Sequence, residues 1–166
     1  ESENPIQEPD IVMLDLYANS DFLGNLESSD TACGAAVLGS KIKQLRSQNP
    51  EGSAFLCLGD ALSGTPIAAL VQGKSVIDVL NAVSYDTFTL GNHEFDWGPD
   101  TLVESLKNSN FPVLSANITY KETGKLLDGV QPYVILEKNG VKIGILGLTT
   151  ISTPTIIREE YAEVLS

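Results

Sequence analysis

The 166-residue chain has the length and composition of one globular domain, with 42% hydrophobic and 19% charged residues. Its net charge of −12 at pH 7 repels phosphate groups, which disfavours nucleic acids and anionic membranes as partners. No apolar run approaches the roughly 20 residues of a membrane-spanning helix, so we expect no membrane span.

The start of the chain differs from the rest in composition. Residues 1–9 are acidic and contain proline, so we expect a mobile tail before a domain that covers residues 10–166. Cys33 and Cys57 are too few to define a disulfide framework. Cys57 lies inside an apolar run, and we expect it to be a buried thiol.

Apolar strands alternate with helical patterns along most of the chain, which predicts an α/β fold with a largely parallel sheet flanked by helices. Strands are predicted over residues 11–16, 54–58, 87–90 and 111–116. Helices are predicted from the repeat Ala35, Leu38, Ile42 and Leu45 to near Asn49, over 66–71, after a cap at Ser75, and from Pro99.

A hairpin is predicted near the end of the chain, because Asn139-Gly140 separates the apolar runs 133–136 and 141–146. An antiparallel pair at this point makes the sheet mixed. Residues 149–166 are polar and acidic, and we expect them to form a loop.

Polar side chains follow three consecutive predicted strands. Asp21 follows the first strand, Asp60 the second, and Asn92 and His93 the third. In a parallel sheet all three positions fall at one edge, within reach of a common point. Carboxylate and amide oxygens suit divalent cations, which would also reverse the local negative field toward a phosphate ester. Each residue alone is equally typical of an ordinary turn.

His93 is the only histidine of the chain. An imidazole titrates near neutral pH, and the carboxylate of Asp96, three residues on, can hold one ring nitrogen if this stretch turns helically. The pair therefore predicts an oriented general acid or base, with a solvated turn histidine as the alternative. We expect Glu94 to cap a helix or to face solvent, and Trp97 to pack around the loop.

Three motifs are specific enough to compare with known families. They are Leu58-Gly59-Asp60, Gly64-Thr65-Pro66 and Leu90-Gly91-Asn92-His93-Glu94-Phe95-Asp96-Trp97-Gly98, supported by residues 114–118 and 141–147. Here the chain resembles the 5′-nucleotidase family of calcineurin-like metallophosphoesterases. The resemblance implies the N-terminal part of a four-layer metallophosphoesterase sandwich. It also implies a hydrolase of nucleotide catabolism that removes phosphate from a nucleotide by metal-activated water.

The resemblance also implies a site with two divalent metal ions, zinc, manganese or similar. Asp60 would bridge both ions, Asn92 would bind the second and Asp21 the first. His93 would face the phosphate as a catalytic residue, oriented by Asp96. The implied partner is a small-molecule nucleotide or phosphate ester, and the implied location is extracellular, cell-surface or periplasmic.

The chain departs from the family pattern in two respects. Leu23 stands where the family has a metal-binding histidine, so metal binding is expected to be reduced or lost at the first position. The further histidines, the C-terminal half and the substrate domain of the family have no counterpart in these 166 residues. We therefore expect a partial domain that is inactive alone.

Two other functions stay open. One is that of a divergent relative that has lost the chemistry and serves as a surface or nucleotide-binding module. Alternatively, the chain is an α/β ligand-binding domain with a fortuitous Asn-His loop. The sequon Asn117-Ile118-Thr119 falls at the end of a predicted buried strand, and we expect it to be a coincidence.

Overall fold

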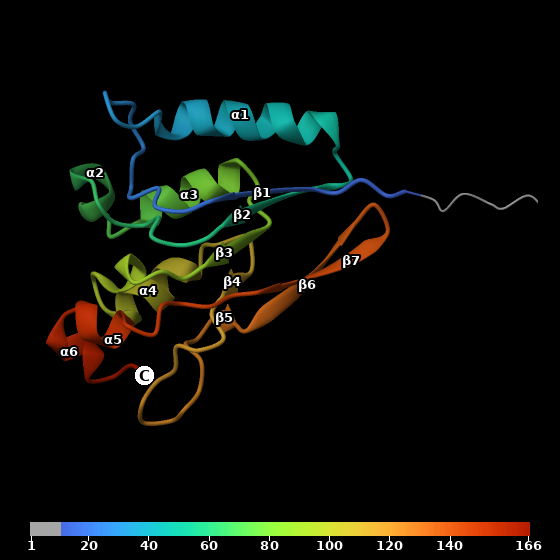
Figure 1. Cartoon of the computed structure of the whole chain (residues 1–166). Helices are drawn as coiled ribbons and strands as arrows, with labels where there is room; N and C mark the ends of the chain where they lie inside the picture. The colour runs from blue at the N-terminus through green and yellow to red at the C-terminus, as the bar shows by residue number, and fades with distance from the viewer. Residues whose placement is uncertain (1–10) are drawn as a thin grey trace, which may run out of the picture.

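The central element of the fold is a parallel sheet of five short strands in the order β1-β2-β3-β4-β5, described here from a computed structural model (Figure 1). The strands are β1 Asp15–Asn19, β2 Ser53–Cys57, β3 Thr87–Thr89, β4 Val113–Leu114 and β5 Val130–Gln131. The structure describes residues 11–166, so the predicted tail lies outside the described residues. The α/β class with a largely parallel sheet is confirmed.

Helices separate β1 to β4 along the chain, and two more follow the last strand. They are α1 Gly34–Gln48, α2 Pro66–Ala69, α3 Lys74–Ala82, the 3₁₀ turn η1 His93–Phe95, α4 Pro99–Leu106, α5 Thr153–Ile156 and α6 Glu159–Ala162. In Figure 1, α1 runs alongside β1 and β2. Its buried face contacts Phe55 of β2, which stacks on Tyr17 of β1 at 4.8 Å between ring centroids. No helix among residues 11–166 is long and apolar enough to cross a bilayer.

Several predicted boundaries are wrong in detail. β1 begins at Asp15 rather than residue 11, and the two-residue strand β5 was not predicted. Helix α3 begins one residue before Ser75, behind Gly73, whose φ of 81° lets the backbone turn closely over Leu62. Residues 149–166 do not form a plain loop, because they contain the single-turn helices α5 and α6.

The predicted hairpin is present as β6 Tyr133–Lys138 and β7 Val141–Leu146. Its two turn residues, Asn139 and Gly140, have φ angles of 48° and 75°, as a two-residue hairpin turn requires. The hairpin forms a two-stranded sheet of its own, so the expectation that it joins the main sheet is wrong.

The carboxylate of Asp86 is one of the groups that attach the hairpin to the parallel sheet. Asp86, just before β3, accepts hydrogen bonds from Lys138 Nζ at 2.6 Å, Arg46 Nη2 at 3.0 Å and the backbone N–H of Phe55 at 2.8 Å. At the tip, the Asn139 backbone N–H donates to the carbonyl of Glu51 at 3.0 Å. These contacts fix the hairpin at the edge of the fold opposite the carboxyl ends of β1 to β3.

The strand register determines where the polar clusters lie. Asn19, Cys57, Phe88 and Val113 are successive partners across β1 to β4. Asp21, Asp60 and Asn92 follow this row by two to four residues, so each begins a loop at the same edge of the sheet.

Both cysteines are free thiols in different environments. Cys57 is fully buried in the core, as predicted, and Cys33 is exposed. Burial raises the pKa of Cys57 to about 12, so the nucleophilic thiolate is not populated near neutral pH.

We therefore expect one reactive thiol in the native chain. At about pH 8 a chromogenic disulfide reagent will titrate Cys33 alone, and it will titrate Cys57 only after denaturation. A Cys33→Ser variant will show no native reaction. Two thiols reacting at equal rates in the folded parent would contradict the buried placement of Cys57.

Candidate active site

The loops that follow β1, β2 and β3 contact one another at the carboxyl edge of the sheet. The Asp21 backbone N–H donates to the carbonyl of Gly59 at 3.1 Å, and that of Leu23 donates to the carbonyl of Asp60 at 3.0 Å. The His93 backbone N–H donates to Asp60 Oδ1 at 2.9 Å. Asp60 therefore contacts both neighbouring loops, and the predicted site residues share one edge.

Backbone strain is concentrated in these loops. Asp21, Leu23 and Asp60 have φ angles of 55°, 47° and 52°, in the left-handed region that such residues rarely adopt. Each costs about 1–3 kcal/mol relative to an ordinary conformation. The loops also approach closely, since a Cβ on Gly59 would lie 2.6 Å from the backbone nitrogen of Gly91. Such strain is typical of functional sites, where the surrounding structure holds side chains in a particular geometry.

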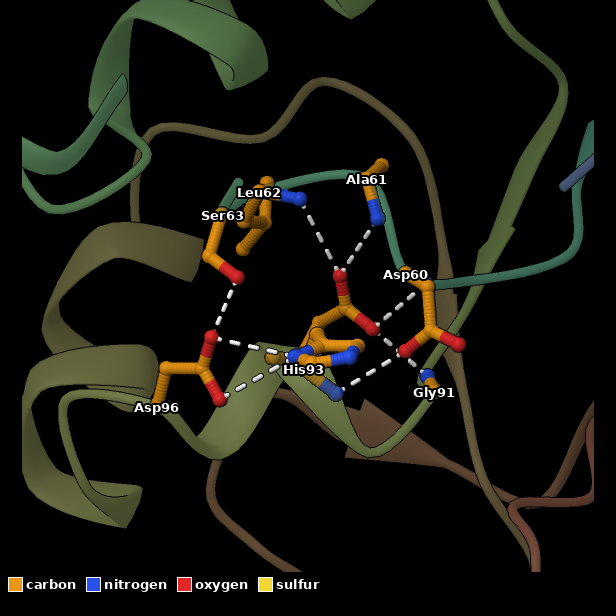
Figure 2. Close-up of polar contacts among 8 residues, drawn as sticks. Asp60, Ala61, Leu62, Ser63, Gly91, His93 and Asp96 are labelled. Atoms are coloured by element: carbon orange, nitrogen blue, oxygen red, sulfur yellow. Dashed lines mark hydrogen bonds and ion pairs between the residues drawn. The ribbon is translucent and has the colours of Figure 1, made fainter. Parts of the chain in front are cut away.

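Glu94 holds the β2 and β3 loops together from inside. Its side chain is buried, and its two oxygens accept four backbone N–H bonds. The donors are Asp60 at 2.8 Å, Ala61 at 2.8 Å, Leu62 at 3.2 Å and Gly91 at 2.6 Å. Figure 2 shows these bonds converging from the labelled residues. Burial raises the pKa of Glu94, and the four N–H donors oppose that rise.

The expectation that Glu94 caps a helix or faces solvent is therefore wrong. The 3₁₀ turn η1 directs Glu94 inward and leaves His93 on the surface. The Gly-rich loops contain backbone N–H groups that no strand or helix satisfies, but no spacing in the sequence shows that Glu94 accepts them.

The same turn brings His93 and Asp96 together. His93 Nδ1 lies 3.2 Å from Asp96 Oδ2 and 3.3 Å from Oδ1. Burial lowers the pKa of His93, but the hydrogen bond and charge of Asp96, with the charges of Asp60 and Glu94, raise it above its ordinary value. Because Asp96 occupies Nδ1, the other ring nitrogen is the one available to a ligand.

Ser63 contacts Asp96 from the far side, and sequence reasoning missed it. Its hydroxyl donates to Asp96 Oδ2, as Figure 2 shows. A cavity of about 540 Å³ opens beside these two residues and is also lined by Trp97 and Arg158. The space next to the dyad is therefore large enough for a small-molecule ligand.

The predicted metal donors lie at this edge but are few. Asp21 is exposed, Asp60 and Asn92 are half-buried, and one oxygen of Asp60 already accepts the His93 N–H. Glu94 has no free acceptor capacity after its four bonds. Among residues 11–166 no group of three or more His, Cys, Asp or Glu side chains is arranged to hold a metal ion. The oxygen donors of these three residues are of the type that divalent cations prefer, but they are too few to complete a two-metal centre.

Thr149 anchors the end of β3 from the C-terminal side. Its hydroxyl donates to the carbonyl of Leu90 at 2.8 Å, and its backbone exchanges two hydrogen bonds with the Asn117 side chain, at 2.8 and 2.9 Å. The Asn117 amide is thus used within the fold, which fits the expectation that its sequon is a coincidence. No pattern in the sequence signals the role of Thr149.

Known proteins resemble this chain over most of its length. It is 40% identical over 131 residues to a 5′-nucleotidase of Vibrio cholerae, covering 77% of this chain and 23% of the relative. It is 37% identical over 136 residues to the snake venom 5′-nucleotidase of Gloydius brevicauda, covering 80% and 23%. A bovine 5′-nucleotidase is 40% identical over 124 residues, covering 73% and 21%. The chain thus spans less than a quarter of the length of these relatives.

Solved structures agree with these relatives. The NAD nucleotidase of Haemophilus influenzae superposes with a TM-score of 0.76 at 33% identity, covering 84% of this chain and 27% of that protein. A putative 5′-nucleotidase of Staphylococcus aureus superposes with a TM-score of 0.79 at 28% identity, covering 91% and 31%. No protein-family model matches the chain.

We expect Glu94→Gln to destabilise the fold. The amide keeps one acceptor oxygen and turns its N–H₂ toward two backbone N–H donors, each of which costs about 1–3 kcal/mol when left unsatisfied. The free energy of unfolding in urea should fall by about 2–4 kcal/mol.

The matched control is Glu104→Gln. This exposed glutamate pairs with Lys107 on the surface, and its loss should change the unfolding free energy by under about 0.5 kcal/mol. Equal stabilities for the two variants would show that the buried carboxylate does not hold the loops.

Proposed function

Because this chain belongs to the 5′-nucleotidase family of calcineurin-like metallophosphoesterases, we propose that the whole protein hydrolyses phosphate monoesters of nucleotides. The observation that carries this proposal is the placement of His93. Its backbone nitrogen donates to the Asp60 carboxylate, and its ring contacts Asp96, at the edge where three strained loops meet. The residues proposed for cation binding and for proton transfer are thus neighbours at this edge.

His93 is proposed to act through the ring nitrogen that does not contact Asp96. With Nδ1 occupied by Asp96, that nitrogen can stabilise the developing charge of a phosphoryl group or protonate the departing alkoxide. The cavity beside Asp96 offers room for the leaving group. Asp96 is the proposed partner that keeps the imidazole oriented.

The metal ligands proposed from this part of the protein are Asp21, Asp60 and Asn92. The expected ions are zinc or manganese. When bound, such ions neutralise phosphate charge and acidify a water molecule. The donors present here are too few for that centre, so further ligands from the rest of the protein are part of the proposal.

The proposed substrate and location follow the relatives. The names of the matched proteins support a nucleotide or NAD-like ester as the substrate class. The proposed location is extracellular, cell-surface or periplasmic, and the names of the venom relatives support the extracellular one.

A second candidate is a non-catalytic module that keeps the fold to bind a nucleotide or a surface. The observation in its favour is Leu23, whose apolar side chain follows Asp21 at the edge where the metal donors gather. An inactive whole protein that still binds nucleotide would support this candidate.

The activity test uses the whole protein with added Mn²⁺ or Zn²⁺ and a nucleoside 5′-monophosphate. We expect phosphate release, and we expect His93→Ala to lower kcat about 10²–10⁴-fold while metal uptake is retained. Lys107→Ala, an exposed surface change, is the control and should match the parent. Unchanged turnover in His93→Ala would reject the proposed role of the imidazole.

A metal-binding test follows from Leu23. Its left-handed backbone suits histidine better than leucine, and its N–H already bonds to Asp60. We expect Leu23→His to tighten Mn²⁺ or Zn²⁺ binding to the 166-residue chain at least about tenfold by calorimetry. The gain should vanish in an Asp60→Asn background. An unchanged affinity in Leu23→His would place residue 23 outside the metal site.

A further inference from the structure

The Asp96 carboxylate has two side-chain partners in the described part of the chain, and they lie on different loops. His93 contacts it from within the same turn, and Ser63 donates to it from the loop after β2. A carboxylate only accepts hydrogen bonds, so both partners must present a hydrogen to it. The Ser63 hydroxyl and the His93 Nδ1–H therefore restrain Asp96 from two directions.

We propose that Ser63 is a positioning residue that holds Asp96 in the orientation that fixes the Nδ1–H tautomer of His93. The catalytic meaning of this inference rests on the proposed function, because that function uses the free ring nitrogen of His93. The tautomer itself is a property of the chain without substrate or metal.

Burial makes the Ser63 contact specific. Ser63 is only 3% exposed, so the surrounding fold fixes the position of its hydroxyl. The Asp96 and His93 side chains are 39% and 47% exposed, so packing alone does not restrain them. The orientation of the more exposed pair thus depends on the one donor that is fixed inside the fold.

The position of Ser63 is itself fixed by the turn that carries His93 and Asp96. Glu94 lies between His93 and Asp96 in sequence, and it binds the backbone N–H groups of Ala61 and Leu62, directly before Ser63. The contacts form a closed circuit, from η1 through Glu94 to the β2 loop and back through Ser63 to Asp96 (Figure 2). A shift of either loop would therefore misalign the hydroxyl and the carboxylate together.

The test measures the tautomer directly, because the chain contains a single histidine. Long-range ¹H–¹⁵N correlation spectra of the ¹⁵N-labelled 166-residue chain, at about pH 9 where the neutral imidazole predominates, give the protonation of each ring nitrogen. We expect the Nδ1–H form to predominate in the parent. Ser63→Ala should lower its population toward the value measured in Asp96→Ala, and Ser63→Thr, which keeps the hydroxyl, should restore it.

The matched control is Thr65→Val. This change removes a hydroxyl from the same loop, but that hydroxyl donates to the Gly24 carbonyl at 2.5 Å and not to Asp96. The control should keep the parent's tautomer ratio even if it lowers stability. A parent-like ratio in Ser63→Ala, or an equal change in Thr65→Val, would overturn the inference. Neither result bears on phosphate release by the whole protein, so failure here is distinct from failure of the proposed function.

Discussion

The whole candidate site depends on one buried carboxylate that never reaches the surface. Glu94 accepts hydrogen bonds from four backbone N–H groups on two loops. These N–H groups have no backbone acceptor within a strand or helix. Without it, several buried N–H groups would lose their acceptors at a cost of about 1–3 kcal/mol each. These bonds help to offset the strain at Asp60 and fix the separation between the loops. The exposed His93 is thus supported by a buried residue whose charge also helps to raise the pKa of the imidazole.

Hydrogen bonds from the C-terminal part of the chain also hold the loops at this edge. Thr149, three residues after β7, donates its hydroxyl hydrogen to the carbonyl of Leu90. Leu90 directly precedes the loop that carries His93. Far from the site, Asp86 fixes the hairpin through Lys138 and Arg46, so the segment leading to Thr149 is held at both ends. Contacts from several elements therefore hold the loops at the carboxyl edge in place. An oriented catalytic group requires such support.

Sequence patterns were sufficient for elements whose signal is local. The helical repeat of α1, the Asn-Gly turn of the hairpin and the strand-end position of Asp60 all follow from spacing and residue type. Patterns failed where tertiary contacts decide. Strand β5 is too short to have a period, and the cap of α3 depends on a close approach to Leu62. The inward direction of Glu94 and the contact of Ser63 with Asp96 depend on which loops the fold brings together, and no spacing records that.

The left-handed backbone at position 23 has an evolutionary consequence. The β1 loop keeps a left-handed backbone that histidine adopts more readily than leucine, and leucine and histidine codons can differ by a single base. If residue 23 is encoded by CTT or CTC, one base change would place an imidazole at this edge of the sheet. Exchange between leucine and histidine at this position would therefore need no remodelling of the main chain.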